Sequence, residues 1–262
     1  MRETFRYLNN KSYWEKRWND IEVDDPMINK NQYPLKYAIE TINYQDKEQK
    51  ILEAGCGAGR ILKYFYYKKY NITGIDFIEC AIKKIINSDK KINAFRDDIL
   101  KTRFKNEEFD TILAFGLYHN FQKSNFIKAL IETKRILKQG GILCFSFRSD
   151  NIQNFILDKI KNKDSNFDTN KKFHKLNLKE NEIIEILKKN KLKILEKKYV
   201  TNMPLLFHFK IFRSNEQKKF NEHLGRKNGY TLNFFGKLLN KFLITFFKKK
   251  YCNIYIFYVR KL

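Results

Sequence analysis

From about residue 50 onward, short apolar runs of strand-forming residues alternate with segments whose apolar positions recur at helical spacing. This alternation is typical of βαβ units built around a mostly parallel sheet. Strands are expected at 50–53, 71–76, 92–96, 109–115, 142–147, 192–200 and 253–259, and helices at 60–67, 79–87, 124–137 and 182–189. Ser124 is a candidate N-cap for the third helix, and Gly140-Gly141 are expected to end it.

Two regions do not fit this alternation. Residues 1–49 precede the first strand and are expected to form a helical cap that contains the aromatic segment YWEKRW at 13–18. Residues 201–250 separate the last two strands and are too long for a simple connection. We therefore expect a main domain at 50–262, in which the insertion 201–250 binds the acceptor or acts as a lid.

The composition sets the class of protein. Hydrophobic residues make up 43% of the 262 residues, which supports a folded core, and no apolar run approaches the length of a membrane-spanning helix. The formal charge of +24 favours a polyanionic partner, but an AT-rich genome would enrich lysine in the same way, and we prefer that explanation. The polar first residues predict a cytoplasmic protein, and the scattered cysteines and histidines predict no metal site.

The segment that carries chemistry runs from Ile51 to Arg60 and reads ILEAGCGAGR. A strand delivers an acidic residue, and glycines then follow at alternate positions before a helix. Glycine allows a sharp turn and a close approach of a ligand to the backbone. The dinucleotide fingerprint G-x-G-x-x-G would require glycine where Arg60 stands, so the expected ligand has no pyrophosphate.

Here the sequence resembles the class I S-adenosylmethionine-dependent methyltransferases. The segment E-x-G-x-G-x-G at 53–59 matches their first motif, and the acid at the end of GIDF (74–77) matches their second. Further matches are RDDI (96–99), FDTILAFGLYHNF (109–121) and RILKQGGIL (135–143), the last with Gln139 in place of the family's proline. The resemblance implies a Rossmann-like, doubly wound, mostly parallel seven-stranded α/β sheet with an antiparallel last strand, and S-adenosylmethionine as cofactor.

The same resemblance implies a role for individual residues. Glu53 would face the ammonium group of the cofactor, Asp76 the ribose hydroxyls and Asp98 the adenine amine, while Phe77 and Ile99 enclose the adenine and Phe115 lies near the sulfur. Arg17 would pair with the carboxylate, although a plain packing role for Tyr13, Trp14 and Arg17 remains open. The predicted cofactor-binding residues are Glu53, Ala54, Gly55, Cys56, Gly57, Gly59, Asp76, Phe77, Asp98, Ile99, Phe115, Tyr13, Trp14 and Arg17.

A catalytic base is useful if the acceptor is a hydroxyl group, because that group loses a proton when it is methylated. His119 follows the fourth strand and is the candidate, with Tyr118 and Asn120 as candidate orienting residues. The alternative is that His119 only packs or forms a local hydrogen bond, since no neighbour in the sequence defines its tautomer.

The acceptor is open from the sequence. Motifs of the adenine, glutamine and cytosine methyltransferases are missing, which favours a small-molecule, sugar or lipid-linked acceptor methylated on oxygen rather than nitrogen. An RNA acceptor and a non-catalytic cofactor-binding subunit are the alternatives. In the insertion, Leu232, Phe235, Leu239, Phe242 and Phe246 recur at helical spacing beside lysines. Such a helix could contact the inner membrane face through 232–250, but packing over the sheet or the active site is the preferred interpretation.

Overall fold

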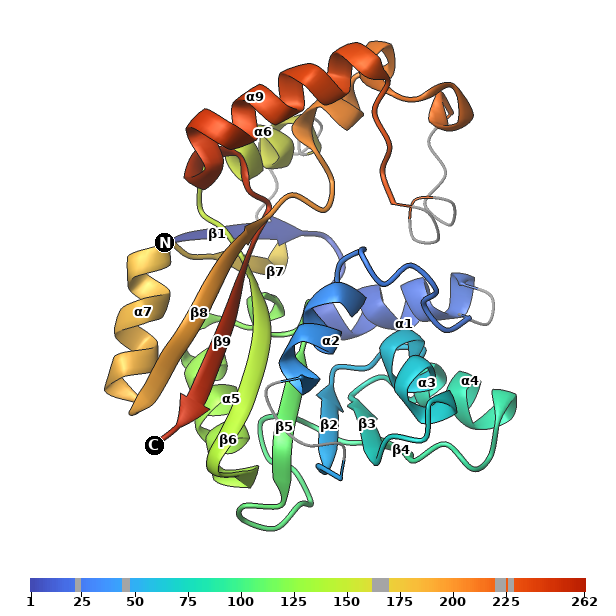
Figure 1. Ribbon diagram of the computed structural model, residues 1–262, viewed down its shortest axis with the longest axis vertical. Helices are drawn as coiled ribbons and strands as arrows, with labels where there is room; N and C mark the ends of the chain where they lie inside the picture. The colour runs from blue at the N-terminus through green and yellow to red at the C-terminus, as the bar shows by residue number, and fades with distance from the viewer. Residues whose placement is uncertain (22–24, 44–47, 162–169, 220–224, 226–228) are drawn as a thin grey trace.

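The computed structural model describes residues 1–21, 25–43, 48–161, 170–219, 225 and 229–262. Its centre is a seven-stranded sheet in the order β4-β3-β2-β5-β6-β9-β8, in which β9 runs opposite to the other six strands (Figure 1). The strands are β2 (Ile51–Ala54), β3 (Ile72–Asp76), β4 (Ala94–Arg96), β5 (Phe109–Ala114), β6 (Leu137–Arg148), β8 (Leu192–Val200) and β9 (Ile254–Lys261). The predicted fold class is confirmed.

Helices cover both faces of this sheet, because the apolar residues of its central strands point alternately to the two sides. On one face, Leu143 and Phe145 of β6 pack in the cluster that contains α5 (Lys123–Ile136) and α7 (Glu180–Lys189). On the other face, Cys144 packs in the cluster formed with helices of the first half of the chain. These helices are α2 (Leu35–Ile42), α3 (Arg60–Tyr67) and α4 (Glu79–Ser88).

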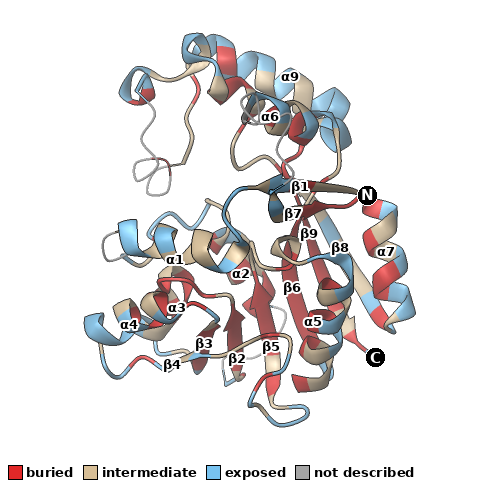
Figure 2. Cartoon of the chain, turned by 180° about the vertical axis from the view of Figure 1, so that it is seen from behind, coloured by how far each residue is buried: buried red, intermediate tan, exposed pale blue. Residues whose placement is uncertain are grey.

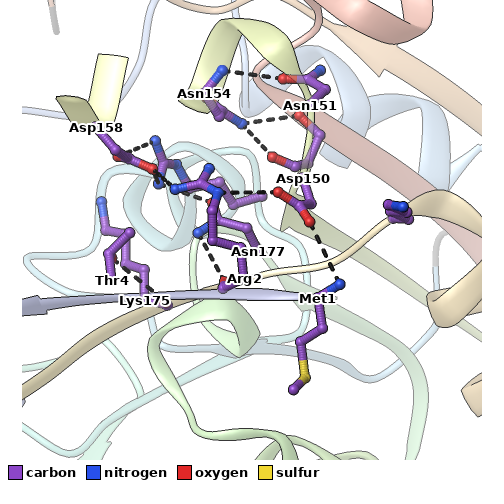
Figure 3. Close-up of polar contacts among 12 residues, drawn as sticks. Met1, Arg2, Thr4, Asp150, Asn151, Asn154, Asp158, Lys175 and Asn177 are labelled. Atoms are coloured by element: carbon purple, nitrogen blue, oxygen red, sulfur yellow. Dashed lines mark hydrogen bonds and ion pairs between the residues drawn. The ribbon is translucent and has the colours of Figure 1, made fainter. Parts of the chain in front are cut away.

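Several elements were not expected from the sequence. β1 (Arg2–Arg6) pairs antiparallel with β7 (Lys172–Asn177) and forms a separate two-stranded sheet. Ion pairs join Arg2 to Asp150 and to Asp158 of α6 (Ile152–Lys161), so this small sheet is tied to the segment that follows β6 (Figure 3). Helices α1 (Asn10–Asp20) and α9 (Phe234–Tyr251) lie in regions expected to be helical. The remaining elements are the short 3₁₀ helices η1 (Tyr118–Asn120), η2 (Leu205–His208), η3 (Lys210–Phe212) and η4 (Asn215–Gln217).

Two predicted helix boundaries were wrong. Ser124 is not an N-cap, because α5 already begins at Lys123 and Gln122 occupies the capping position. The glycine pair does not end α5 either, since the extended backbone of Leu137 ends the helix first. Gly140 and Gly141 belong instead to the start of β6, where a side chain at Gly141 would press against the carbonyl oxygens of Lys138 and Asp110.

Helix α9 lies at one end of the molecule beside α6, at the opposite end from the tip of β5 (Figure 1). The preferred prediction was that its apolar stripe packs over the sheet or the active site. Leu232, just before the helix, is buried, but Phe235, Leu239, Phe242 and Phe246 are exposed to solvent. That packing prediction was therefore wrong for the helix itself, which faces inward mainly through Gly236 and its neighbours.

Candidate active site

A cavity of about 1330 Å³ opens at the carboxyl ends of β2, β3, β5 and β6. In parallel α/β sheets this edge is where ligands bind, because the loops that follow the strands diverge there. The cavity is also lined by α1, by the loop 31–34 before α2, and by the insertion. The side chain of Gln32 reaches the carbonyl oxygen of Gly225 at 3.5 Å, so the N-terminal cap and the insertion meet across this space.

The glycine loop after β2 has the geometry that its sequence requires. Gly55 and Gly57 both have positive φ angles, of 72° and 53°, and both line the cavity together with Cys56. The backbone N–H groups of Gly55 and Cys56 both donate to the carbonyl oxygen of Ile75, which ties the loop to β3. The loop therefore presents backbone without side chains at two positions of the cavity wall.

Two predicted residues of this segment have structural positions instead. Ala54 is fully buried in β2 and does not line the cavity. Gly59 lies at the N-cap of α3 with a φ of 82°, and a Cβ there would meet the Ile85 side chain of α4 at 3.0 Å. The role of Gly59 is thus close packing of α3 against α4, which differs from the predicted contact with the cofactor.

Glu53 is a buried carboxyl group, only 5% exposed, at the back of the glycine loop. Its Oε2 atom accepts a hydrogen bond of 2.8 Å from the backbone N–H of Leu62. Burial raises the pKa of Glu53 to about 8, and the nearby charge of Asp76 adds to this rise. Much of this carboxyl group is therefore protonated at neutral pH, until a cation binds beside it.

Asp76 holds the turn at the end of β3. One of its oxygens accepts from the N–H of Gly57 at 2.8 Å and the other accepts from the N–H of Ile78 at 2.9 Å. Removal from water raises the pKa of Asp76, and the two backbone hydrogen bonds oppose that rise. Both oxygens retain lone pairs for a ligand, since a carboxylate has about four acceptor sites.

The pair Asp97 and Asp98 follows β4, and both residues line the cavity. Asp97 forms an ion pair of 3.2 Å with Arg103 and accepts from the N–H of Asp98. Asp98 uses one oxygen to accept from the N–H of Leu100 at 2.9 Å. Among the described residues, Asp97 thus forms an ion pair and Asp98 does not.

This difference gives a first prediction. Asp98→Ala should weaken S-adenosylmethionine binding about tenfold, because a charged acceptor for the adenine amine is worth roughly 1.5–3 kcal/mol, of which solvent recovers part. Asp97→Ala is the matched control and should change the affinity less than threefold, since its carboxylate serves Arg103. Titration calorimetry of the two variants measures both values. A larger loss in the Asp97 variant would contradict the assignment.

Helix α1 covers the glycine loop. Trp14, Arg17 and Trp18 line the cavity, whereas Tyr13 does not and instead lies under the guanidinium group of Arg6. The rings of Trp14 and Trp18 are stacked, with centroids 6.0 Å apart. A Cβ at Gly57 would overlap the Trp18 indole, and Lys84 of α4 donates to the carbonyl oxygens at the end of α1. Sequence reasoning missed Trp18, although it follows Trp14 by one helical turn.

His119 lies in η1, directly after β5, and lines the cavity. Its Nδ1 atom has no hydrogen-bond partner among the described residues, and its ring packs on Phe147. Burial lowers the pKa of His119 well below 6.5, and the positive charges of Lys175 and Arg148 lower it further. The imidazole is therefore neutral near pH 7, which is the form that can accept a proton.

Tyr118 and Asn120, the predicted orienting partners of His119, form hydrogen bonds with other groups. Tyr118 is fully buried, and its hydroxyl group bonds to Thr133. The Asn120 side chain donates to the carbonyl oxygens of Gly116 and Leu117 and so closes its own turn. The orienting role predicted for both residues was therefore wrong.

The unusual pKa of His119 gives a second prediction. Because the unfolded chain takes up a proton near pH 6.5 and the folded chain does not, the free energy of unfolding should fall below that pH by up to about 1.4 kcal/mol per pH unit. His119→Gln should remove this part of the slope. Chemical denaturation at several pH values between 5 and 8 measures it, and equal slopes in the two proteins would contradict the expectation.

The aromatic wall beyond β5 includes a residue that sequence reasoning missed. Phe115 lies edge-on to Tyr33, with centroids 6.0 Å apart, and both line the cavity. The Tyr33 hydroxyl is 2.9 Å from Oγ of Ser146, which accepts from the N–H of Gly116 at 2.7 Å. Burial raises the pKa of Tyr33, so its hydroxyl stays protonated. The contact between Tyr33 and Ser146 could not be predicted from the local sequence at 31–34, because it depends on how the N-terminal cap packs on β6.

Acidic and basic residues both line the cavity, and Lys11, Arg17 and Arg60 are among the basic ones. Its acidic lining residues are Glu53, Asp76, Asp97 and Asp98, which follow or end β2, β3 and β4. Arg148, Lys172 and Lys175 line the part reached from β6 and β7, and no acidic residue lines it among the described residues. Within the same described part of the chain, no group of three or more His, Cys, Asp or Glu side chains is placed to hold a metal ion.

The acidic end fits S-adenosylmethionine in the chemistry of its groups. The ligand carries an ammonium group, two ribose hydroxyls and an adenine amine, which are all donors, and this end of the cavity supplies carboxyl acceptors beside glycine backbone. Phe77, which is exposed, and Ile99, which is buried, line the same cavity and offer apolar surface to a ring. The residues present are therefore compatible with the cofactor that the sequence motifs imply.

Comparison with known proteins identifies the domain. Residues 51–141 match the family model described as a methyltransferase domain. A 100-residue segment is 30% identical to the uncharacterized methyltransferase YodH of Bacillus subtilis, covering 37% of this chain and 42% of that protein. A 94-residue segment is 33% identical to a human protein named probable tRNA methyltransferase 9B, covering 36% of this chain and 20% of that protein.

A solved structure extends the likeness to the whole fold. Magnesium protoporphyrin IX methyltransferase from Synechocystis, solved with bound SAH, matches with a TM-score of 0.57 and 12% identity over 98% of this chain and 97% of that one. Residues 51–141 thus match a methyltransferase domain in sequence, and the whole chain shares the fold of a solved methyltransferase. The chain spans less than half the length of the two curated relatives named above.

Proposed function

We propose that this protein transfers a methyl group from S-adenosylmethionine to a small-molecule, sugar or lipid-linked acceptor, on oxygen rather than nitrogen. One observation carries the proposal. The glycine loop, the carboxylates of Asp76 and Asp98, and the neutral imidazole of His119 all line the same cavity. They come from four separate segments of the chain, and their convergence at one sheet edge matches the requirements of a cofactor site with an adjoining reaction site.

The acidic end would hold the cofactor. Glu53 would pair with the ammonium group, which stabilises its ionised form, and Asp76 would accept from the ribose hydroxyls. Asp98 would accept from the adenine amine, with Phe77 and Ile99 on either side of the ring. Trp14, Arg17 and the unpredicted Trp18 would cover this end and exclude water, since all three face the cavity from α1.

Bound there, S-adenosylmethionine supplies an electrophilic methyl group on a sulfonium. Phe115 and Tyr33 would form the weakly solvated wall beside the reacting atoms, where exclusion of water and alignment lower the barrier. His119 would accept the proton that the acceptor hydroxyl loses, because its imidazole lines the cavity and is neutral at pH 7. His119 is thus the proposed catalytic base.

The remaining cavity would receive the acceptor. Residues of the insertion line one side of it, and Gln32 of the N-terminal cap contacts Gly225 of the insertion. This enclosure supports a small acceptor, or the head of a larger lipid-linked one, over a folded macromolecule. Asn154, Met203 and Asn253 contribute polar and apolar groups to the same walls.

The test is transfer of a labelled methyl group by the purified chain. Extract fractions that hold small molecules, glycans, lipids, RNA or protein are each incubated with the enzyme and labelled S-adenosylmethionine. Label in the small-molecule, glycan or lipid fraction, lost in Asp76→Ala and reduced in His119→Gln, supports the proposal. Label confined to RNA or protein overturns the acceptor class, and calorimetry without any heat of cofactor binding overturns the whole assignment.

An RNA acceptor is the second candidate. The formal charge of +24 and the likeness to a relative named as a tRNA methyltransferase support it. If it is correct, binding to RNA should weaken steeply between about 50 and 200 mM salt, since each phosphate contact releases a counterion. Retention on RNA that does not change over this range would exclude it. Absence of transfer to every fraction, with normal cofactor binding, would favour a non-catalytic subunit.

A further inference from the structure

The outward face of α9 exposes large apolar side chains to solvent. Phe234, Phe235, Leu238, Leu239, Phe242 and Phe246 are between 39% and 74% exposed. They recur every three or four residues and so form one stripe along the helix, which we call the α9 stripe. In Figure 2, most of this helix is coloured as exposed residues. A contiguous apolar surface of this kind marks an interaction site in a folded protein.

The stripe is held in position by the opposite face of the helix. Gly236 is the buried residue of α9, and a Cβ there would meet the carbonyl oxygen of Phe212 at 2.8 Å. The N-cap Asn233 accepts from the N–H of Gly236 and donates to the carbonyl oxygen of Ile211. Ile244 lines the cavity on the inward side. The α9 stripe therefore cannot turn inward without breaking this anchorage.

Charge indicates what the stripe contacts. Residues 234–251 contain Lys237, Lys241, Lys248, Lys249 and Lys250 and no acidic residue. Lys248 and Lys249 lie against Tyr199, and Lys249 pairs with Glu180, an acid already bonded to Lys197. Lys237 and Lys241 are exposed on one flank of the stripe, and Lys250 is exposed at its end. The surface is thus apolar along its centre and basic at its edge.

We propose that α9 docks this protein on a membrane surface that contains anionic phospholipid, lying in the plane of the interface. The stripe enters the boundary between head groups and acyl chains, and Lys237 and Lys241 contact the head-group phosphates. No described helix has the length and apolarity needed to cross a bilayer, which is consistent with a helix lying flat. A second copy of the chain is less suited to this face, because it would bring the same lysines and a charge of +24.

The experiment is flotation of the full-length chain with lipid vesicles. We expect strong binding to vesicles of phosphatidylcholine with phosphatidylglycerol, and at least tenfold weaker binding to phosphatidylcholine alone or at high salt. Phe235→Ser with Phe242→Ser should lower the binding at least tenfold, and Lys237→Gln with Lys241→Gln should lower it severalfold. The matched control pairs Ile131→Ser with Lys128→Gln on exposed positions of α5 and should leave binding unchanged.

The outcomes separate this inference from the proposed function. Cofactor binding by calorimetry should be the same in all these variants, because none of the substituted side chains lines the cavity. No binding to anionic vesicles, or equal loss in the α5 control, overturns membrane docking. Concentration-dependent dimers in sedimentation that are lost in the phenylalanine variant also overturn it, and assign the stripe to a second copy.

Discussion

Asp76→Ala is expected to weaken S-adenosylmethionine binding by at least about 100-fold. The substitution removes the acceptor for two backbone N–H groups, those of Gly57 and Ile78, and with it the proposed contact with the ribose. A hydrogen bond to a charged acceptor is worth roughly 1.5–3 kcal/mol, so loss of the proposed bonds to both ribose hydroxyls corresponds to about 3 kcal/mol or above. Titration calorimetry with the cofactor and with its demethylated product measures the loss.

Asp89, at the end of α4, provides a control substitution. Asp89 also accepts a backbone N–H, that of Lys91, but it does not line the cavity. Asp89→Ala should therefore leave cofactor affinity within about threefold of the parent, although it removes the same kind of local hydrogen bond. Equal affinities for the parent and Asp76→Ala, with both variants folded by circular dichroism, would show that Asp76 does not bind the cofactor.

The second large effect is a pH dependence that originates at Glu53. The pKa of this carboxyl group is about 8 without ligand, and it must lose its proton to pair with the ammonium group of the cofactor. Each pH unit below 8 then costs about 1.4 kcal/mol, so affinity should rise close to tenfold per unit from pH 6 toward 8 and then level off. Glu53→Gln, which keeps an acceptor for the N–H of Leu62, should show a flat dependence.

Comparison of the two proteins at each pH cancels the titration of the cofactor itself. The sign for stability is the opposite of that for binding. The folded pKa of Glu53 is raised, so the stability it contributes is complete below about pH 4.5 and is lost as the pH rises through 8. Without cofactor, Glu53→Gln should thus be at least as stable as the parent at pH 8. Parallel affinity curves for parent and variant would contradict a contact between Glu53 and the ammonium group.

The placement of residues at the acidic end of the cavity could be predicted because it depends on local sequence. Glycines at 55 and 57, an acid at the end of β3 and another after β4 all follow parallel strands, and such strands end at one edge of the sheet. Gly59 has a packing position that the sequence did not indicate, for a related reason. The motif shows that a glycine is required there, but only the packing of Ile85 against it shows what the glycine is for.

The rest depends on contacts between distant segments. Trp18 covers Gly57, and Tyr33 reaches Ser146 across 113 positions of the chain, so neither contact leaves a local pattern. The strands β1 and β7 are short, polar and paired with each other, which hides them from a search for buried apolar runs. The sequence could also not predict whether the α9 stripe packs inward or faces solvent, since both kinds of helix have the same apolar periodicity.

Helix α2 is joined to strands β8 and β9 through the carboxylate of Glu40. Glu40 accepts from the hydroxyl of Tyr258 in β9 and from the ammonium of Lys198 in β8, while Leu35 and Ile42 are buried beneath it. The N-terminal cap is consequently an integral part of the domain, because removal of residues 1–49 would expose apolar side chains of the sheet to solvent. Each large aliphatic group lost from that contact removes about 1.5–3 kcal/mol. Shortened versions designed from the methyltransferase motifs alone would precipitate, and expression should retain every residue from the first onward.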